Sequence, residues 1–261
     1  MNRLKDCRHG RMLFNEHDIY IGRSLDLYGE FSEGECEVFR QLIRPGSMVL
    51  ELGANIGSHT VFLAKLVGPT GRVVAFEPQR VVFQSLCANV ALNDILNVQC
   101  YQKAVGAKAG SLIVPTLDFN AGNNFGGLGL GTFTNGETVP VVAVDDLELN
   151  ACHFIKIDIE GMEREAILGA KNTIERFKPV LYVENDRADR SDALVETLNQ
   201  FGYAMYWHKP PMFSPHNFFG NQENIFGGIV SMNMICIHSS IQHKIDCPRV
   251  LDTRSAEKTN L

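Results

Sequence analysis

The stretch VLELGANIGSHT, Val49 to Thr60, decides the fold because it joins a buried strand to a helix through a short glycine-bounded turn. The apolar run Met48 to Leu50 predicts a buried strand, and Ser58 to Ala64 has the apolar spacing of a helix. Gly53 and Gly57 bracket the turn, where glycine lets the backbone approach a ligand closely. A turn that leads directly into a helix N-terminus is typical of a nucleotide-binding site.

The acidic side chain of Glu51 indicates which nucleotide this turn binds. A dinucleotide places its pyrophosphate at the helix N-terminus, where a neighbouring carboxylate would repel it at reduced dielectric. A carboxylate instead suits a ligand with cationic ammonium and sulfonium groups, which describes S-adenosylmethionine. The spacing is Gly-x-Asn-x-Gly, whereas dinucleotide-binding turns have Gly-x-Gly-x-x-Gly. The sequence therefore favours S-adenosylmethionine over NAD.

A second acid follows the next predicted strand. Val73 to Phe76 is a short apolar strand, Glu77 comes directly after it, and Pro78 ends it. Glu77 lies about 20 residues after Gly57, where doubly wound folds use an acid to accept hydrogen bonds from ribose hydroxyls. Taken alone, Glu77 would more simply be a solvated glutamate at a strand end. Together with the first motif, it predicts a ribose-binding residue.

Length, composition and charge predict a single enzyme domain. The chain has 261 residues, 45% hydrophobic and 21% charged, which suffices for one substantial core. A net charge of -6 argues against a nucleic-acid partner, which normally requires a basic surface. The N-terminal residues lack an apolar signal core, and no run reaches the roughly 20 apolar residues of a membrane span. Seven dispersed cysteines without a Cys-x-x-Cys pair favour a reducing compartment. We therefore expect a cytoplasmic protein without a transmembrane segment.

Strands and helices alternate along most of the chain, which predicts a parallel sheet. Near the N-terminus, Met12 to Phe14 and Ile19 to Ile21 are expected to form a hairpin, followed by a helix from about Glu33 to Ile43. A single strand is expected over Val98 to Ala104. The expected division is a hairpin and helix cap over residues 1–45, a cofactor-binding core over 46–240 and a polar, flexible tail over 241–261.

Two long segments without helical or strand periodicity interrupt this pattern. Residues 118–137 form a Gly- and Asn-rich loop between strands predicted at Ser111 to Val114 and Val139 to Val144. We expect that loop either to border the substrate pocket or to be a mobile excursion. Residues 210–228 contain five Met and Phe side chains among Pro, Gly and Asn. They form either an apolar wall for a sugar or ring substrate or a plug over the sheet edge.

Acidic residues also follow two later strands. In FIKIDIEGMERE, one apolar strand ends at Asp158 and Glu160, and the next strand ends at Glu184 and Asn185. Open α/β sheets bind ligands at the carboxyl ends of their strands. We therefore expect these four side chains to face one crevice.

The combination LELGANIG, AFEP, KAVG, IKIDIEGMEREAILGA and VEN resembles the FkbM family of S-adenosylmethionine-dependent methyltransferases over roughly residues 20–240. The resemblance implies an α/β, Rossmann-like class I methyltransferase sheet of seven mostly parallel strands. The implied strand order is 3-2-1-4-5-7-6 with the seventh strand antiparallel, and the last two strands fall at Tyr203 to Trp207 and Met232 to His238. Family members often carry Asp at the position of Glu51.

The resemblance also implies roles for single residues. The turn with Glu51 would hold the methionine part, Glu77 the ribose and Ala104 or its neighbours the adenine edge, while Asp158 would close the site near the donor methyl. The cofactor-binding residues implied in this way are Glu51, Gly53, Ala54, Asn55, Gly57, Glu77, Pro78, Ala104 and Asp158.

Methyl transfer to an alcohol also requires removal of a proton. The transfer is an in-line displacement, and an aliphatic hydroxyl is a poor acid, so a general base or a metal must assist. Asp158 with Glu184 and Asn185 resembles the oxygen-ligand set with which catechol-type O-methyltransferases hold Mg²⁺. His59 is expected on a helix surface or in packing. The candidates for the catalytic groups are Asp158, Glu160, Glu184 and His208.

The preferred function is therefore O-methylation of a small-molecule hydroxyl on a sugar, a glycolipid or a natural-product-type ring. Two alternatives stay open: an NAD-dependent oxidoreductase on a Rossmann fold, and a cofactor-binding scaffold without catalysis. Glu51 and the glycine spacing disfavour the oxidoreductase.

Overall fold

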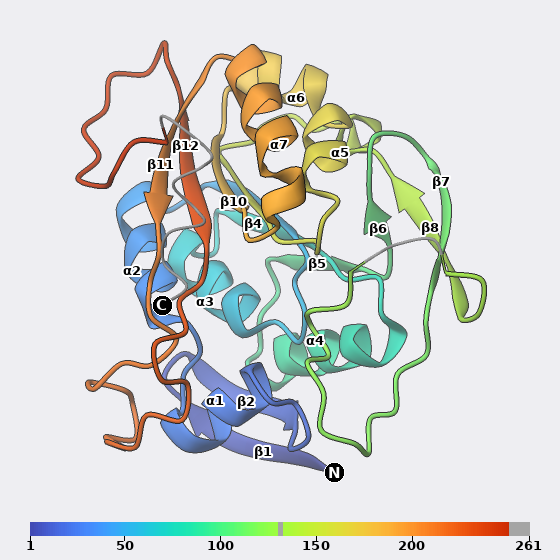
Figure 1. Cartoon of the computed structure of the whole chain (residues 1–261), viewed down its shortest axis with the longest axis vertical. Coiled ribbons are helices and arrows are strands. Elements are labelled where there is room, and N and C mark those ends of the chain that lie inside the picture. Colours follow the sequence, from blue (N-terminus) through green and yellow to red (C-terminus); the bar gives the residue numbers. More distant parts are fainter. Residues whose placement is uncertain (130–132, 251–261) are drawn as a thin grey trace.

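The computed structural model describes residues 1–129 and 133–250, and a seven-stranded sheet forms its centre (Figure 1). The spatial order is β11-β12-β10-β9-β3-β4-β5, and β12 alone runs antiparallel to its neighbours. Numbered along the chain, this order is 3-2-1-4-5-7-6, so the class I methyltransferase sheet is confirmed. Its strands are β3 (Met48–Leu52), β4 (Arg72–Phe76), β5 (Val98–Tyr101), β9 (Phe154–Ile157), β10 (Val180–Glu184), β11 (Tyr203–His208) and β12 (Asn233–His238).

Helices cover both faces of this sheet. One face packs against α5, α6 and α7 in the largest apolar cluster, and the other packs against α2 and α3. Helix α4 lies beside β5 and also contacts the N-terminal strand β2. The bounds are α2 (Glu33–Leu42), α3 (Ser58–Val67), α4 (Arg80–Leu92), α5 (Glu163–Leu168), α6 (Lys171–Phe177) and α7 (Ala188–Gln200).

Side chains alternate between the two faces along each strand, and this decides which residues lie together at the carboxyl ends of the strands. We call these ends the ligand edge of the sheet. Leu50 and Leu52 of β3 pack on the α5–α7 face, whereas Val49 packs on the α2–α3 face. Because successive side chains point to opposite faces, Glu51 also lies on the α2–α3 face. Lys156 is the register partner of Glu51 on β9 and occupies the same face. Two opposite charges are thus placed side by side near the strand ends.

The chain leaves the central sheet after Tyr101. The expected strand over Val98 to Ala104 is therefore two strands, because a turn closed by the Lys103 N–H and the Tyr101 carbonyl (2.9 Å) redirects the chain. The second piece joins a separate sheet of order β6-β8-β7. That sheet contains β6 (Ala104–Val105), β7 (Gly110–Val114) and β8 (Glu137–Val142), and the short 3-10 helix η1 (Val144–Leu147) follows it.

The N-terminal hairpin exists but pairs differently from the prediction. It consists of β1 (Asn2–Cys7) and β2 (Gly10–Asn15), whereas Ile19 to Ile21 lead into helix α1 (Ile21–Tyr28). The reason is local: Asn15 Oδ1 accepts the His17 N–H (2.8 Å), and Asp18 Oδ1 accepts the Tyr20 N–H (2.9 Å). These two side-chain turns favour a bend into a helix over a strand.

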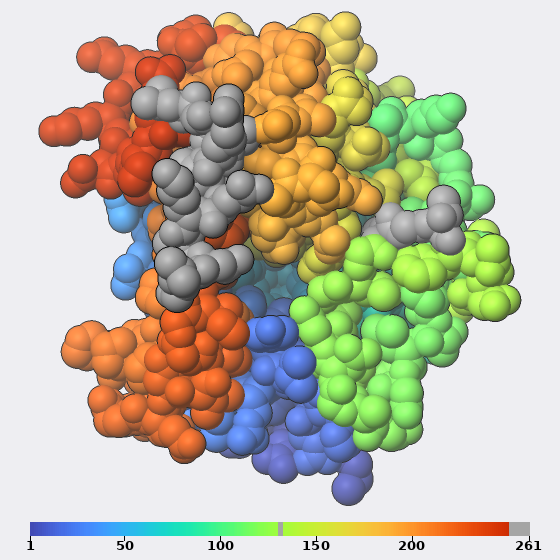
Figure 2. All heavy atoms as spheres, viewed as in Figure 1, coloured from blue at the N-terminus to red at the C-terminus, as the bar shows by residue number. Residues whose placement is uncertain are grey.

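Loops and the N-terminal segment surround the ligand edge of the sheet. In the space-filling view, the N-terminal part (blue), the loop before β8 (green) and the region of α7 (orange) meet around a recess (Figure 2). Of the tail expected at 241–261, residues 251–261 lie outside the described part. Within the described part, Pro248 and Val250 bond to the backbone of β11. No described helix has both the length and the apolar character to cross a membrane.

Candidate active site

A cavity of about 550 Å³ opens at the carboxyl ends of β3, β4, β9 and β10. It contains most of the predicted site residues, although they come from segments more than a hundred residues apart. Those that line it are Glu51, Gly53, Ala54, Asn55, Glu77, Asp158, Glu160 and Glu184. These side chains therefore lie around one cavity, as their positions at the strand ends led us to expect.

The glycine turn is shaped by close backbone contacts. Gly53 has φ 84°, and a Cβ at this position would lie 1.7 Å from the carbonyl oxygen of Asp158. Gly57 has φ 85°, and its Cβ would lie 2.7 Å from Leu86. Gly57 therefore lets the turn pack closely against Leu86, and it does not line the cavity itself. Any side chain at Gly53 would push β3 and β9 apart at the ligand edge.

Glu77 is held by main-chain donors. Its carboxylate accepts the N–H groups of Asn55 (3.0 Å) and Gln79 (2.8 Å). Burial raises the pKa of Glu77 to about 7, although these two hydrogen bonds favour the ionised form. The amide of Gln79 also donates to the Phe125 carbonyl (2.6 Å), which ties this strand end to the loop before β8. The acid is thereby fixed at the end of β4.

A buried ion network lies beside the turn. Lys156 is 3% exposed, and its Nζ lies 2.7 Å from Asp158 Oδ2. The pKa of Lys156 is raised by Asp158, Glu51 and Glu35, whose charges outweigh the effect of its burial. Burial raises the pKa of Glu51 to about 7, while Lys156 and the Thr60 hydroxyl, 2.6 Å from Glu51 Oε2, oppose this shift. The region carries more carboxylates than cations, which suits a cationic ligand.

Three carboxylates gather at the ends of β9 and β10. Asp158, Glu160 and Glu184 each offer an oxygen within 4.8 Å of the others. Asp158 pairs with Lys156, and Glu160 pairs with Arg187 (2.6 Å). Glu184 Oε2 is buried and has no hydrogen-bond partner among the described residues. Burial, with Asp158 and Asp186 nearby, raises the pKa of Glu184 well above its ordinary value.

Asn185 does not join this cluster as the predicted metal set requires. It follows Glu184 along the chain, so its side chain points to the other face of the sheet. There its amide donates to Met234 Sδ (3.3 Å), and it does not line the cavity. Glu160 is the third residue that contributes an oxygen to the group, where the sequence had predicted Asn185.

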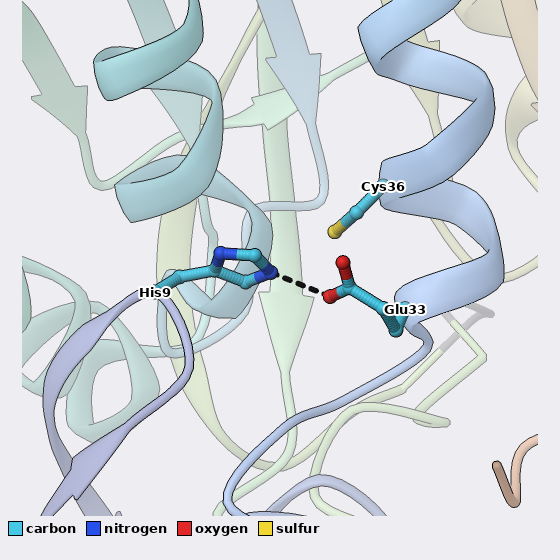
Figure 3. A group of neighbouring side chains, drawn as sticks. All are labelled: His9, Glu33 and Cys36. Atoms are coloured by element: carbon cyan, nitrogen blue, oxygen red, sulfur yellow. Dashed lines mark hydrogen bonds and ion pairs between the residues drawn. The ribbon is translucent and has the colours of Figure 1, made fainter. Parts of the chain in front are cut away.

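A second group of possible ligands lies outside the cavity (Figure 3). His9 Nε2 and Glu33 Oε2 are 2.6 Å apart in a hydrogen bond, with Cys36 beside them. Glu33 also binds Arg40 (2.6 Å) and lies 3.9 Å from Arg8. Two guanidinium groups already neutralise this carboxylate and would repel a cation. The group therefore fastens the β1–β2 turn to α2.

Three other predicted residues also lie away from the cavity. His208 bonds through Nδ1 to the Tyr182 hydroxyl (2.8 Å) and does not line the cavity. Ala104 is buried in β6, paired with β8, because the chain has left the central sheet before it. Pro78 lies beside Glu77 but faces a separate small pocket.

The N-terminal cap and residues 212–233 supply a further wall of the cavity, of which only the segment 210–228 had been expected from the sequence. The wall residues from these two regions are Tyr20, Ile21, Phe31, Glu35, Met212, Ile229, Val230, Ser231, Met232 and Asn233. Glu35 had a detectable signal, since it lies four residues before Phe39 on the apolar side of a predicted helix. His59 does pack, against Phe31 and Phe39, but it also lines the cavity.

The sheet order and a glycine turn flanked by buried acids define a class I methyltransferase. A family model described as the methyltransferase FkbM domain matches residues 51–205, which is more than half of the chain. The chain therefore belongs to the FkbM methyltransferase family.

The individual relatives share limited sequence identity with this chain. The chain is 26% identical over 230 residues to 31-O-demethyl-FK506 methyltransferase FkbM of Streptomyces tacrolimicus, covering 75% of this chain and 88% of that protein. It is 35% identical over 65 residues to methyltransferase sdnD of Sordaria araneosa, covering 24% and 25%. Among solved structures, methyltransferase FkbM of Methylobacillus flagellatus KT is 19% identical with a TM-score of 0.47. That match covers 77% of this chain and spans 50% of the other.

Proposed function

We propose that this chain is an S-adenosylmethionine-dependent O-methyltransferase that acts on a hydroxyl of a small molecule. The observation that carries the proposal is the pair of buried acids, Glu51 and Glu77, at either side of the Gly53 turn. Glu77 suits the ribose hydroxyls, and Glu51 suits the cationic methionine part. Membership of the FkbM methyltransferase family supports the same donor.

Glu184 is the group we assign to proton removal. Asp158 and Glu160 are each held by a cation, whereas Glu184 Oε2 is buried without a partner. Burial and the neighbouring Asp158 raise the pKa of Glu184, so this carboxylate binds a proton more tightly than an ordinary glutamate does. In the reaction, the acceptor oxygen bonds to the methyl carbon as the carbon–sulfur bond breaks. The bonding electrons stay on sulfur, and the hydroxyl proton goes to Glu184.

The carboxylates of Asp158, Glu160 and Glu184 also fit a hard divalent cation such as Mg²⁺. The fit rests on the oxygen-only donor set and on the unpartnered Glu184 oxygen, and such an ion would have to displace Lys156 from Asp158 and Arg187 from Glu160. When bound, such an ion would lower the pKa of the acceptor hydroxyl. Activity measured in strong chelator and then with added Mg²⁺ separates the two routes: full activity in chelator assigns proton removal to Glu184 alone.

We assign the acceptor to the apolar wall of the cavity. Phe31, Met212 and Ile229 face the same space as the acid cluster, which suits a ring alcohol with an apolar surface. The named relative from Streptomyces acts, by its name, on 31-O-demethyl-FK506, a natural product. We therefore favour a natural-product-type alcohol, with a sugar or a glycolipid as the other members of the class.

Calorimetry on the full chain tests the donor. We expect uptake of S-adenosylhomocysteine and none of NADH, and the opposite result would establish the oxidoreductase alternative. A mass-spectrometric screen of alcohol acceptors with isotope-labelled methyl donor then tests transfer. Binding of the donor together with unchanged biological activity in a Glu184→Gln variant would favour a non-catalytic scaffold.

A further inference from the structure

Three buried polar side chains line the cavity without a role in the reaction described so far. They are Glu35 of α2, His59 of α3 and Lys156 of β9, with exposed fractions of 5%, 5% and 3%. Burying polar groups away from water costs free energy unless they find partners. A ligand bound in the cavity would supply such partners.

His59 has the least satisfied side chain of the three. Its ring packs against Phe31 and Phe39, with centroid distances of 5.8 and 5.7 Å. Its Nε2 is buried and has no hydrogen-bond partner among the described residues. Burial, and secondarily the charge of Lys156, lower the pKa of His59 well below its ordinary value. A backbone hydrogen bond with Ser32 acts in the opposite direction, and the neutral imidazole carries a single N–H.

Glu35 is oriented by its own element and by β12. Its Oε1 accepts the Ser32 hydroxyl (2.8 Å) and the Asn233 amide (3.3 Å). Ser32 holds this position with φ 47°, a left-handed conformation that costs a non-glycine residue free energy. The other oxygen, Oε2, lies 4.0 Å from His59 Nε2. A carboxylate and a neutral imidazole therefore face each other across a gap that a small polar group can bridge.

The charges around this gap match an amino-acid zwitterion. Lys156 of β9 lines the same cavity as Glu35 and His59 and its charge acts on both, while Asp158 and Glu51 add negative charge around it. An α-ammonium needs a carboxylate, and an α-carboxylate needs a cation and N–H donors. The cavity offers Glu35 for the first, and Lys156 with His59 for the second.

We propose that Glu35, His59 and Lys156 bind the amino-acid end of the methyl donor, with the ammonium at Glu35 and the carboxylate at His59 and Lys156. This inference rests on the proposed function, since it requires S-adenosylmethionine as the donor. It separates the donor site into an adenosine part, anchored by Glu77, and a zwitterion part between α2 and α3. His59 then orients the donor and does not remove the acceptor proton.

The test compares three ligands that share adenosine. S-adenosylhomocysteine has the whole amino-acid end, its decarboxylated analogue keeps only the ammonium, and 5′-methylthioadenosine has neither group. Calorimetry on the full chain gives the affinity of each ligand for wild type, His59→Leu and Glu35→Gln. A hydrogen bond to a charged group contributes roughly 1.5–3 kcal/mol, which corresponds to a loss of about 10- to 150-fold.

We expect His59→Leu to lose this factor for S-adenosylhomocysteine only, and Glu35→Gln to lose it for both ammonium-bearing ligands. Neither variant should change the affinity for 5′-methylthioadenosine, and this retained binding also shows that the variant is folded. Glu77→Gln is the matched control, because it should weaken all three ligands alike. His59→Gln, whose amide can donate, should restore part of the lost affinity.

Two results would overturn the inference. One is equal affinity of wild type and His59→Leu for S-adenosylhomocysteine, and the other is a fall of kcat in His59→Leu with unchanged ligand affinity, which would make His59 a base. If wild type binds none of the three ligands, the proposed function itself fails.

Discussion

The cavity has two parts, the half that we propose for the methyl donor and the half that we propose for the acceptor, and they are built in different ways. In the donor half, Gly53 and Glu77 are fixed by backbone atoms of neighbouring parallel strands. In the acceptor half, the wall consists of loops that hold one another: the Asn15 amide bonds to the Phe119 carbonyl (2.9 Å), and the Phe219 N–H bonds to the Tyr28 carbonyl (3.0 Å). Acceptor choice can therefore change through the loops while the donor site stays intact.

The largest effect is expected at the point where the two halves meet. Glu184→Gln should lower kcat by about 10²- to 10⁴-fold, the usual contribution of a general base. The affinity for S-adenosylhomocysteine should change less than about 3-fold, because Glu184 contacts the acceptor side. Steady-state kinetics and calorimetry measure both quantities. His208→Gln is the control, and a comparable loss of kcat in that variant would move the base to His208.

Gly53→Ala should disable the donor half as a whole. The added Cβ meets the Asp158 carbonyl at 1.7 Å in a left-handed conformation, so we expect about 3 to 5 kcal/mol of lost stability and no measurable donor binding. Denaturant unfolding and calorimetry provide the measurements. Gly68→Ala is the matched control, since Gly68 has φ 69° but no atom within 4 Å of an added Cβ. Similar losses in both variants would show that backbone conformation alone is responsible.

Glu51→Gln should separate donor binding from stability. The folded-state pKa of about 7 lies above the ordinary 4.5, so the stability contributed by the neutral form is present below pH 4.5 and is lost as pH rises through 7. The Glu51→Gln variant has no carboxyl group at this position, so its stability does not fall in this way as pH rises. Without ligand, it should gain about 3 kcal/mol relative to wild type between pH 4.5 and pH 8, since each unit of pKa difference corresponds to about 1.4 kcal/mol. Unfolding at both pH values tests this, and parallel pH profiles would contradict it. Donor affinity should fall at pH 7.5.

The smallest effect is expected at the acceptor wall. Ile229→Ala removes part of an apolar surface that is already 43% exposed, so the KM for a ring-alcohol acceptor should rise only about 3- to 10-fold. The affinity for S-adenosylhomocysteine should stay within about 2-fold of wild type. If donor affinity fell along with acceptor affinity, the two halves would not be independent.

The difference between the donor half and the acceptor half also explains which parts of the site the sequence could predict. The positions of Glu51, Gly53, Glu77 and Asp158 at the cavity could be predicted, because a strand followed by glycine or an acid fixes both the fold and the position of the residue. His208 was not brought to the cavity, since a strand end alone does not say which residue it faces across the sheet. The acceptor wall depends on contacts between loops distant in sequence, which residue spacing does not encode.

Gln79 forms hydrogen bonds with residues of both the donor half and the acceptor half of the cavity. Its main-chain N–H positions the carboxylate of Glu77, and its side-chain amide holds the Phe125 carbonyl of the loop before β8. We therefore expect a ligand that binds at Glu77, as proposed for the donor nucleoside, to restrain the loop before β8 through Gln79. If the proposed function holds, we expect the methyl donor to bind before the alcohol, because the donor would order a loop that borders the acceptor.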